Sequence, residues 1–170
     1  MIEVLSRPPS TSDVDQLAQL LADAVESGAS VSFMHPFSVD AARDWWRSTI
    51  ERADSRAIIL VARDEAGIAG TVSLQPAWPP NQPHRADIAK LLVHRRARRR
   101  GVGRALMDAI EDHARAAGFT LLTLDTVRGD AADHLYGGAG WQRVGIIPDY
   151  ARYPDGRLCD VVLFYKKLST

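Results

Sequence analysis

The 170-residue chain lacks most of the features that mark specialised protein classes. It has one cysteine, Cys159, so an internal disulfide cannot form, and we expect a reducing, cytoplasmic setting. No stretch approaches the roughly 18 apolar residues of a membrane span, and the N-terminal segment has no apolar run typical of a signal peptide. Basic and acidic residues number 21 each, which argues against a general nucleic-acid or membrane-surface binder.

Metal-ligand clusters, internal repeats and long low-complexity tracts are also missing from the sequence. No group of His, Cys, Asp and Glu residues has metal-ligand spacing, so we predict no metal site. The Pro-rich segment 76–84 is short enough to be a surface loop rather than a linker. With 46% hydrophobic residues, the chain is expected to form one domain over residues 1–170 with a sizeable core.

Apolar periodicity predicts alternating helices and strands along the whole chain. Helices are expected in 8–28, 38–53, 102–118 and 129–140. Strands are expected in 1–7, 86–93, 119–126, 141–147 and 158–168, with a hairpin in 57–76. Ser38 is the expected N-cap of the second helix, and Leu106, Ile110 and Ala117 belong to the expected apolar face of the third. The resulting order, β-α-α-β-β-β-α-β-α-β-β, predicts an α/β (α+β) fold with a mostly antiparallel central sheet flanked by helices.

The most unusual segment is "RRARRRGVGR" at residues 95–104, in which six of ten positions are arginine. A predicted strand ends just before it, and a predicted amphipathic helix begins within it. Arg98, Gly101 and Gly103 form an R-x-x-G-x-G pattern, in which glycines permit a sharp turn. The first helical turn offers unpaired N–H groups and partial positive charge, which suits a phosphate. A solvated surface and a nucleic-acid patch are the alternatives, although no aromatic residues are interleaved with the run.

The segment "LLVHRRARRRGVGRALMDAIEDHA" resembles the acetyl-CoA-binding motif of the GCN5-related N-acetyltransferase (GNAT) superfamily. A second segment, "DAADHLYGGAGWQRVG", resembles another motif of the same superfamily and places Tyr136 at the family tyrosine. The order of elements agrees over nearly the whole chain. Within the superfamily, "GASVSFM", "KLLV", "RGVGRALMD", "LDT" and "PDGRL" look most like the tabtoxin-resistance acetyltransferases.

The resemblance implies a sheet of about seven strands with about four helices, and a slot between two splayed strands that holds coenzyme A. Backbone N–H groups of 99–104 would bind the pyrophosphate, and the backbone of Leu92 and Val93 would face the pantetheine arm. A backbone N–H of the slot strand, that of Leu91, Leu92 or Val93, would face the thioester oxygen. Arg95 and Arg96 would reach the 3′-phosphate or face solvent. The expected cofactor-binding residues are Leu91, Leu92, Val93, Arg98, Arg99, Arg100, Gly101, Val102, Gly103, Arg104 and Tyr136.

Two residues are the expected catalytic groups. Tyr136 would protonate the leaving thiolate or donate a hydrogen bond to its sulfur, although a tyrosine pKa near 10 against a thiol pKa near 8.5 makes full transfer uphill by roughly 2 kcal/mol. Asp125 ends the apolar run "FTLLTLD" and would orient the amine or accept its proton directly or through water. Asp87 and the histidines His94 and His134 are rival bases.

The acceptor site should lie outside the cofactor motif. Its expected residues are Ser32, Phe33, Trp45, Asp87, Asp125, Tyr150 and Arg152, and Arg152 is one option for binding a carboxylate. Two positions depart from the family pattern: Gly129 replaces a common asparagine, and Trp141 replaces a common phenylalanine.

The favoured activity is acetylation of a primary amine of a small molecule, such as an amino-acid derivative, toxin or antibiotic. A protein or peptide amine as acceptor, or a non-catalytic acyl-CoA-binding module, are the alternatives. Family analogy also predicts a homodimer.

Overall fold

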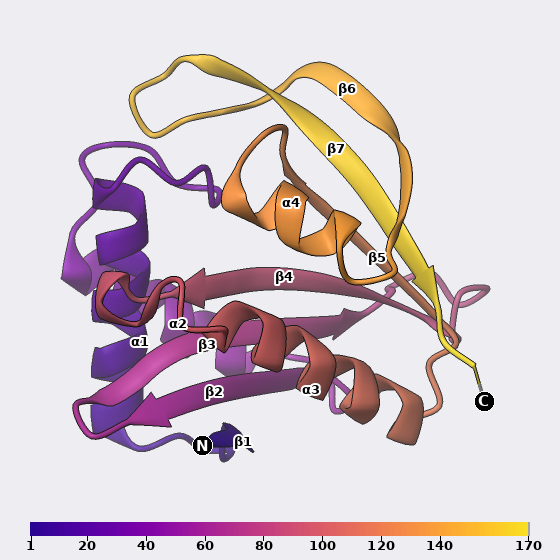
Figure 1. The fold of residues 1–170 in the computed structure, drawn as a ribbon. Helices are drawn as coiled ribbons and strands as arrows, with labels where there is room; N and C mark the ends of the chain where they lie inside the picture. Colours follow the sequence, from indigo (N-terminus) through magenta and orange to yellow (C-terminus); the bar gives the residue numbers. More distant parts are fainter. Residues whose placement is uncertain (170) are drawn as a thin grey trace.

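The computed structural model describes residues 1–169, and its elements follow the predicted order (Figure 1). The strands are β1 (Ile2–Val4), β2 (Ile58–Asp64), β3 (Gly67–Pro76), β4 (Arg85–Val93), β5 (Leu121–Val127), β6 (Gln142–Arg152) and β7 (Leu158–Lys167). The helices are α1 (Thr11–Glu26), α2 (Val39–Glu51), α3 (Val102–Ala116) and α4 (Ala131–Gly137). A short 3₁₀ turn, Arg95–Ala97, lies inside the arginine run and was not predicted.

The seven strands form one sheet in the order β1-β2-β3-β4-β5-β7-β6. Every neighbouring pair is antiparallel except β4 and β5, which run parallel. These two strands pair only from Arg85↔Leu121 to Asp87↔Thr123 and then diverge, as Figure 1 shows. The predicted mixed sheet with a splayed slot is therefore confirmed.

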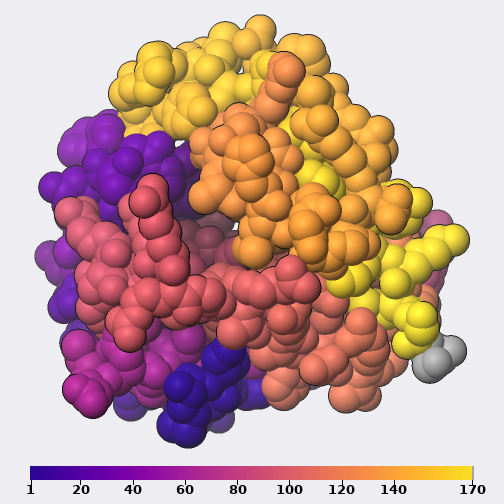
Figure 2. Space-filling model, in the orientation of Figure 1, coloured from indigo at the N-terminus to yellow at the C-terminus, as the bar shows by residue number. Residues whose placement is uncertain are grey.

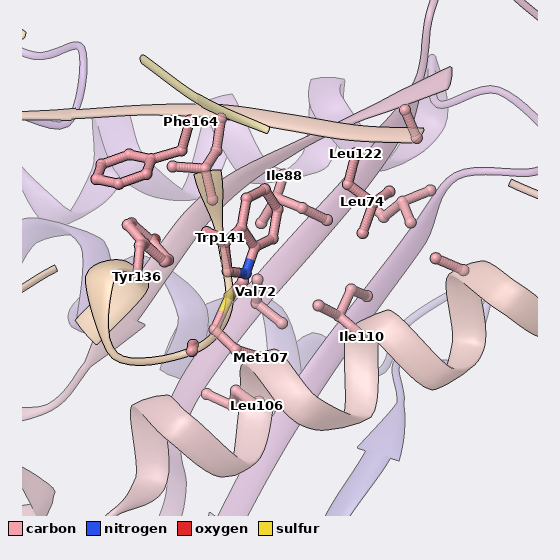
Figure 3. Packing of buried hydrophobic residues seen from close by; sticks show 14 of the residues in the cluster. Val72, Leu74, Ile88, Leu106, Met107, Ile110, Leu122, Tyr136, Trp141 and Phe164 are labelled. Carbon is pink, nitrogen blue, oxygen red and sulfur yellow. The ribbon is translucent and has the colours of Figure 1, made fainter. Parts of the chain in front are cut away.

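Helices cover both faces of the sheet and divide the core in two. Helix α3 packs on one face through Leu106, Met107 and Ile110, together with inward-facing residues of the strands (Figure 3). Helices α1 and α2 pack on the other face, where the buried Trp46 donates its indole N–H to the carbonyl of Leu17 at 3.0 Å. Burial of these apolar faces is the main term that stabilises the fold.

Local signals in the sequence explain where the helices begin. The Ser38 side chain accepts a hydrogen bond from the Ala41 N–H at 3.1 Å, so the predicted N-cap of α2 is confirmed.

The predicted apolar face of α3 is wrong at Ala117, which is exposed beyond the end of the helix. The buried side of α3 contains Met107 and Ala114 instead, because these positions share a face with Ile110 at helical spacing.

A β-bulge in β4 reverses which side chains face each layer. Thr71 pairs with Leu92 and Ser73 pairs with Ala89, so two residues of β4 oppose one residue of β3. Within the bulge, Lys90 has a φ of 52°, a left-handed conformation that is uncommon outside glycine. Before the bulge, Ile88 faces α3; after it, Leu92 faces α1 and α2. The bulge thus lies beside the opening of the slot.

Among residues 1–169, no helix combines the length and hydropathy needed to cross a bilayer.

Candidate functional site

The turn between β4 and α3 exposes a set of backbone N–H groups. Arg99 and Gly101 have φ values of 60° and 80°, so the chain turns sharply just before α3 begins. Gly101 is the N-cap of α3 and provides no side-chain cap, and the helical hydrogen bonds start with Ala105 N–H to Gly101 O at 3.0 Å. The N–H groups of 102–104 are therefore available for an anion. Partial positive charge at this helix end favours a phosphate.

Most arginines of the run contact the protein itself. The contacts are Arg95–Asp23 (2.5 Å), Arg96–Asp64 (3.1 Å), Arg104–Asp108 (3.0 Å) and Arg98 Nε to Val93 O (3.2 Å). The hydrogen bond from Arg96 holds the pKa of Asp64 below its usual range. Within residues 1–169, Arg98, Arg99 and Arg100 form no ion pair, and the side chains of Arg99 and Arg100 also form no hydrogen bond. Their charges are the ones that remain for a bound phosphate.

The edge of β4 that faces the slot presents backbone groups of alternate residues. The His94 N–H donates to Ala69 O of β3 at 2.8 Å, and the Val93 carbonyl accepts from Arg98 on the opposite side. Because successive residues of an antiparallel strand direct their N–H and C=O groups to opposite edges, the Val93 N–H faces the slot. The same alternation directs Leu91 to the slot and Leu92 toward β3. Of the three predicted slot residues, Leu91 and Val93 therefore have suitable backbone orientation, whereas the side chain of Leu92 is buried in the core.

Helix α4 covers the diverging strands and carries Tyr136. The centroid of the Tyr136 ring lies 5.8 Å from that of Trp141 and 5.8 Å from that of Phe164 (Figure 3). Burial is the main cause that raises the pKa of Tyr136 far above its ordinary value near 10, and the nearby Asp125 carboxylate adds to the shift. The hydroxyl forms no hydrogen bond within the part of the chain that the structure describes. Tyr136 is thus a neutral donor at any physiological pH.

The two predicted aspartates have different surroundings. Asp87 lies where β4 and β5 still pair, and its carboxylate contacts both Arg85 and Thr123. Asp125 lies on β5 beyond the last β4 pair, and its side chain is exposed at the slot. The Asp125 charge bears on both Tyr136 and Lys90, since it raises the pKa of each. Asp125 therefore belongs to the slot, whereas Asp87 is held by its neighbours.

Three predicted acceptor residues meet around a residue that sequence analysis missed. The Lys90 ammonium donates to Ser32 Oγ at 3.1 Å and lies 5.6 Å from the Phe33 ring centroid and 5.3 Å from that of Trp45. Phe33 also stacks on Phe37, with centroids 4.3 Å apart. We call Ser32, Phe33, Trp45 and Lys90 the acceptor cluster. A lysine inside a strand carries no local signal, so only the tertiary contact identifies it.

The hairpin between β6 and β7 packs against the loop that carries the acceptor cluster. Ser30 Oγ donates to Arg152 O at 2.7 Å, and the His35 N–H donates to Pro154 O at 3.0 Å. The Arg152 guanidinium donates to Gly156 O at 2.6 Å within its own hairpin, and Tyr150 is 54% exposed. These two predicted acceptor residues thus lie on β6, in the hairpin beside this loop, and do not join the acceptor cluster.

A buried ionic group supports the slot from the side of α3. Glu111, 4% exposed, accepts hydrogen bonds from Trp141 Nε1 at 3.0 Å and from Lys166 Nζ at 2.7 Å. The indole of Trp141 thereby gains a donor function that a phenylalanine would lack, and it fixes the ring against Tyr136. At the other departure from the family pattern, the Gly129 N–H donates to Asp133 Oδ2 at 2.9 Å.

The surface around the slot is hollowed. In Figure 2 a recess lies between the residues that precede α3, the helix α4 and the loop near residue 30. The turn before α3 and Tyr136 come from the first two of these segments, and Ser32 and Phe33 of the acceptor cluster come from the third. No cluster of three or more His, Cys, Asp or Glu residues suited to a metal occurs within residues 1–169. The arrangement offers backbone donors, a neutral tyrosine, one carboxylate and one lysine.

Comparisons with a protein family and with a known relative each cover most of this chain. The family described as "Acetyltransferase (GNAT) family" matches residues 16–141. An N-acetyltransferase from Azospirillum brasilense, encoded in the hisH–hisA intergenic region, is 31% identical over 117 residues, which is 68% of either chain. The family match spans the turn at 98–104 and Asp125.

Solved structures agree in fold. The ribosomal-protein-alanine N-acetyltransferase of Brucella melitensis superposes with a TM-score of 0.81 at 22% identity, covering 99% of both chains. A protein from Salmonella typhimurium, solved with its cofactor acetyl-CoA, superposes with a TM-score of 0.80 at 17% identity and covers 100% of this chain and 94% of its own.

Proposed function

The chain belongs to the GNAT acetyltransferase family and is an N-acetyltransferase that uses acetyl-CoA, and we propose that its acceptor is a primary amine of a small, amino-acid-like molecule. The predicted closer likeness to tabtoxin-resistance acetyltransferases is part of this proposal, as is a role in inactivating a toxin or antibiotic. The single observation that carries the choice of a small acceptor is the acceptor cluster, in which aromatic rings and one lysine face the slot.

The residues of this chain fit coenzyme A at three places. The free N–H groups at the start of α3, with Arg99 and Arg100, suit the pyrophosphate. The pantetheine arm would pass close to Gly103, where a Cβ would make ordinary contacts with Val93 at 3.6 Å and Leu135 at 3.7 Å, on the two sides of the slot. On the edge of β4 that faces the slot, the Leu91 N–H would donate to the same arm, because the Val93 carbonyl already accepts from Arg98. Bound acetyl-CoA supplies the acetyl thioester.

The proposed reaction is direct attack of the amine on the thioester within a ternary complex. A C–N bond forms and a C–S bond breaks; one proton leaves the amine nitrogen and one proton reaches the sulfur. The Val93 N–H would donate to the carbonyl oxygen as negative charge develops there. Asp125 would hold the amine, and its proton would leave through this carboxylate or through water.

Tyr136 would donate a hydrogen bond to the sulfur of the leaving thiolate. Because burial raises its pKa, full proton transfer to a thiolate of ordinary basicity is more uphill than for a free tyrosine. A hydrogen bond to the developing thiolate needs no such transfer, and a charge-assisted bond of this kind contributes about 1.5–3 kcal/mol. We therefore favour stabilisation of the sulfur by the Tyr136 hydroxyl, with the final proton coming from Tyr136 or from water.

A protein or peptide acceptor fits the site less well. Such an acceptor would favour an open, shallow and acid-lined groove, whereas here Lys90 is the charged member of the acceptor cluster. The docked hairpin further narrows this side, through Ser30–Arg152 and His35–Pro154. We also propose a homodimer, because the edge strand β6 exposes Val144, Ile146 and Ile147 on its surface.

A screen for free thiol release from acetyl-CoA tests the proposal. The amine panel would contain amino acids, amino-acid derivatives and lysine-containing peptides, and a protein-free reaction would correct for hydrolysis. We expect release with small amino-acid-like amines and none with peptides. Release with peptides alone would favour the peptide acetyltransferase, and binding of coenzyme A without any release would favour the non-catalytic module.

A further inference from the structure

The acceptor cluster contains a half-buried cation without a carboxylate. The chain has three lysines. Lys166 is paired with Glu111 at 2.7 Å and Lys167 is exposed, whereas Lys90 forms no ion pair within residues 1–169. Its ammonium contacts one hydroxyl, Ser32 Oγ, and two aromatic faces. A partly desolvated charge without a counter-charge is unfavourable, and an anionic ligand would compensate for it.

The fold holds this cation in place at a cost in backbone conformation. Lys90 has a φ of 52° in the bulge of β4, and Ser32, its hydrogen-bond partner, has a φ of 83°. Neither residue is a glycine, so both conformations are uncommon. Phe33 and Trp45, which meet edge to face with centroids 5.4 Å apart, support the ammonium from the side of α2. Residues of three separate segments thus fix one charged atom at the slot.

Lys90 and Asp125 lie on the two strands that diverge, on the same side of the sheet. Leu122 and Leu124 face the core under α3, so the alternation of β5 turns Asp125 to the opposite side, where Lys90 contacts Phe33. The two charges are close enough for Asp125 to raise the pKa of Lys90, although burial outweighs this effect and the net pKa of Lys90 is lowered. One cation and one anion therefore face the same opening without pairing directly.

We propose that Lys90 binds an acid group of the acceptor, so that the substrate is an amine that also carries a carboxylate or a related oxyacid. This inference rests on the proposed function for the identity of the site. The acid group would contact the Lys90 ammonium and the Ser32 hydroxyl, the apolar part of the substrate would pack on Phe33 and Trp45, and the amine would lie toward Asp125. Lys90 is a specificity-determining residue in this arrangement, and the predicted carboxylate partner Arg152 is not required.

The test separates binding of the acid group from catalysis. Calorimetry on protein saturated with coenzyme A, which carries no acetyl group, would measure binding of each L-amino acid and of its C-terminal amide. We expect at least one amino acid to bind about ten-fold or more tightly than its amide, the usual value of one charge-assisted contact. Lys90→Met should abolish that difference, and Lys90→Arg should keep most of it. Lys167→Met, a matched change of an exposed lysine, should leave it unaltered.

Kinetics with acetyl-CoA supply a second readout. For the amino acid, Lys90→Met should raise KM about ten-fold or more with little change in kcat, whereas kinetics with the matching amide should stay within about two-fold. Equal loss on acid and amide would overturn the proposal, because it would indicate a general base or a structural role. Lack of binding by every acid-bearing probe at about 10 mM, above the usual KM range, would also overturn it.

The two proposals can fail separately. Calorimetry could show that an amino acid binds more tightly than its amide, and that this difference depends on Lys90, while no amine releases thiol. The acid-binding site would then be supported, and the proposed acetylation of small amines would be wrong. If amines lacking an acid group are acetylated as efficiently as amino acids, the proposed acetylation of small amines is supported and the proposed role of Lys90 is wrong.

Discussion

Gly101→Val is expected to weaken binding of coenzyme A by more than it weakens the fold. Gly101 has a φ of 80°, and a Cβ added there would meet nothing within 4 Å, so the substitution causes backbone strain rather than a clash. A left-handed conformation costs an L-residue about 1–2 kcal/mol. For a chain of this size that corresponds to a fall in Tm of about 2–8 °C.

The effect on the ligand follows from the position of Gly101 at the N-cap of α3. If the strained turn relaxes, the N–H groups of Val102, Gly103 and Arg104 leave the orientation that suits a pyrophosphate. Each charge-assisted hydrogen bond contributes about 1.5–3 kcal/mol. Loss of one bond would therefore raise the Kd of coenzyme A about 10- to 150-fold.

Two control variants isolate this effect, and calorimetry with thermal unfolding measures both quantities. Gly118→Val imposes the same strain at the other end of α3, where φ is 84° and a Cβ would again meet nothing within 4 Å, so Tm should fall while Kd stays within about two-fold. Arg96→Gln removes a charge that is already paired with Asp64, so Kd should change less than about three-fold. If Arg96→Gln weakened binding more than Gly101→Val, the run would act as an electrostatic patch and our reasoning would be refuted.

The remaining predictions concern the slot and its support. Tyr136→Phe should lower kcat about 10²-fold with little change in the Kd of coenzyme A, and full activity would exclude Tyr136 as the donor. Because burial raises the pKa of Tyr136, its protonated form persists as pH rises, so the wild-type pH profile of kcat should show no decline from this residue below pH about 10. Asp125→Asn should lower kcat/KM for the amine about ten-fold or more, because the carboxylate that orients the amine is lost. An unchanged value would indicate that another residue acts as the base. Trp141→Phe leaves Glu111 without its indole donor and should reduce the free energy of unfolding by about 1–3 kcal/mol, measured by denaturant titration.

Local sequence signals were sufficient for the elements and for the sharp turn between β4 and α3. Ser38 caps α2 as predicted, and the positive φ of Gly101 follows from its place between a strand and a helix. The splayed slot, in contrast, was expected from the family resemblance, because periodicity within a strand says nothing about where two strands stop pairing. Pairing of β4 and β5 ends after Asp87, and this is a property of the whole sheet.

The acceptor side could be predicted only in part. Ser32, Phe33 and Trp45 were named from their place in the fold, and the structure brings them together. Lys90 was missed because its contacts join segments that are 45 or more residues apart, and because a bulge that turns a strand residue to the other face leaves no mark in the apolar pattern. Arg152 was chosen for its chemistry, yet its guanidinium is bound within its own hairpin.

The charge balance of the chain now has a local explanation. A neutral protein can concentrate arginines in one turn because carboxylates elsewhere in the fold neutralise several of them, as Asp23 does for Arg95 and Asp64 for Arg96. In the proposed site, the backbone of the turn would supply much of the attraction for a phosphate. Lys90 differs from Arg95 and Arg96, since no carboxylate of the described chain pairs with it. Paired arginines shape the turn before α3, whereas Lys90 has no carboxylate partner and, in our proposal, would bind the acid group of a second ligand.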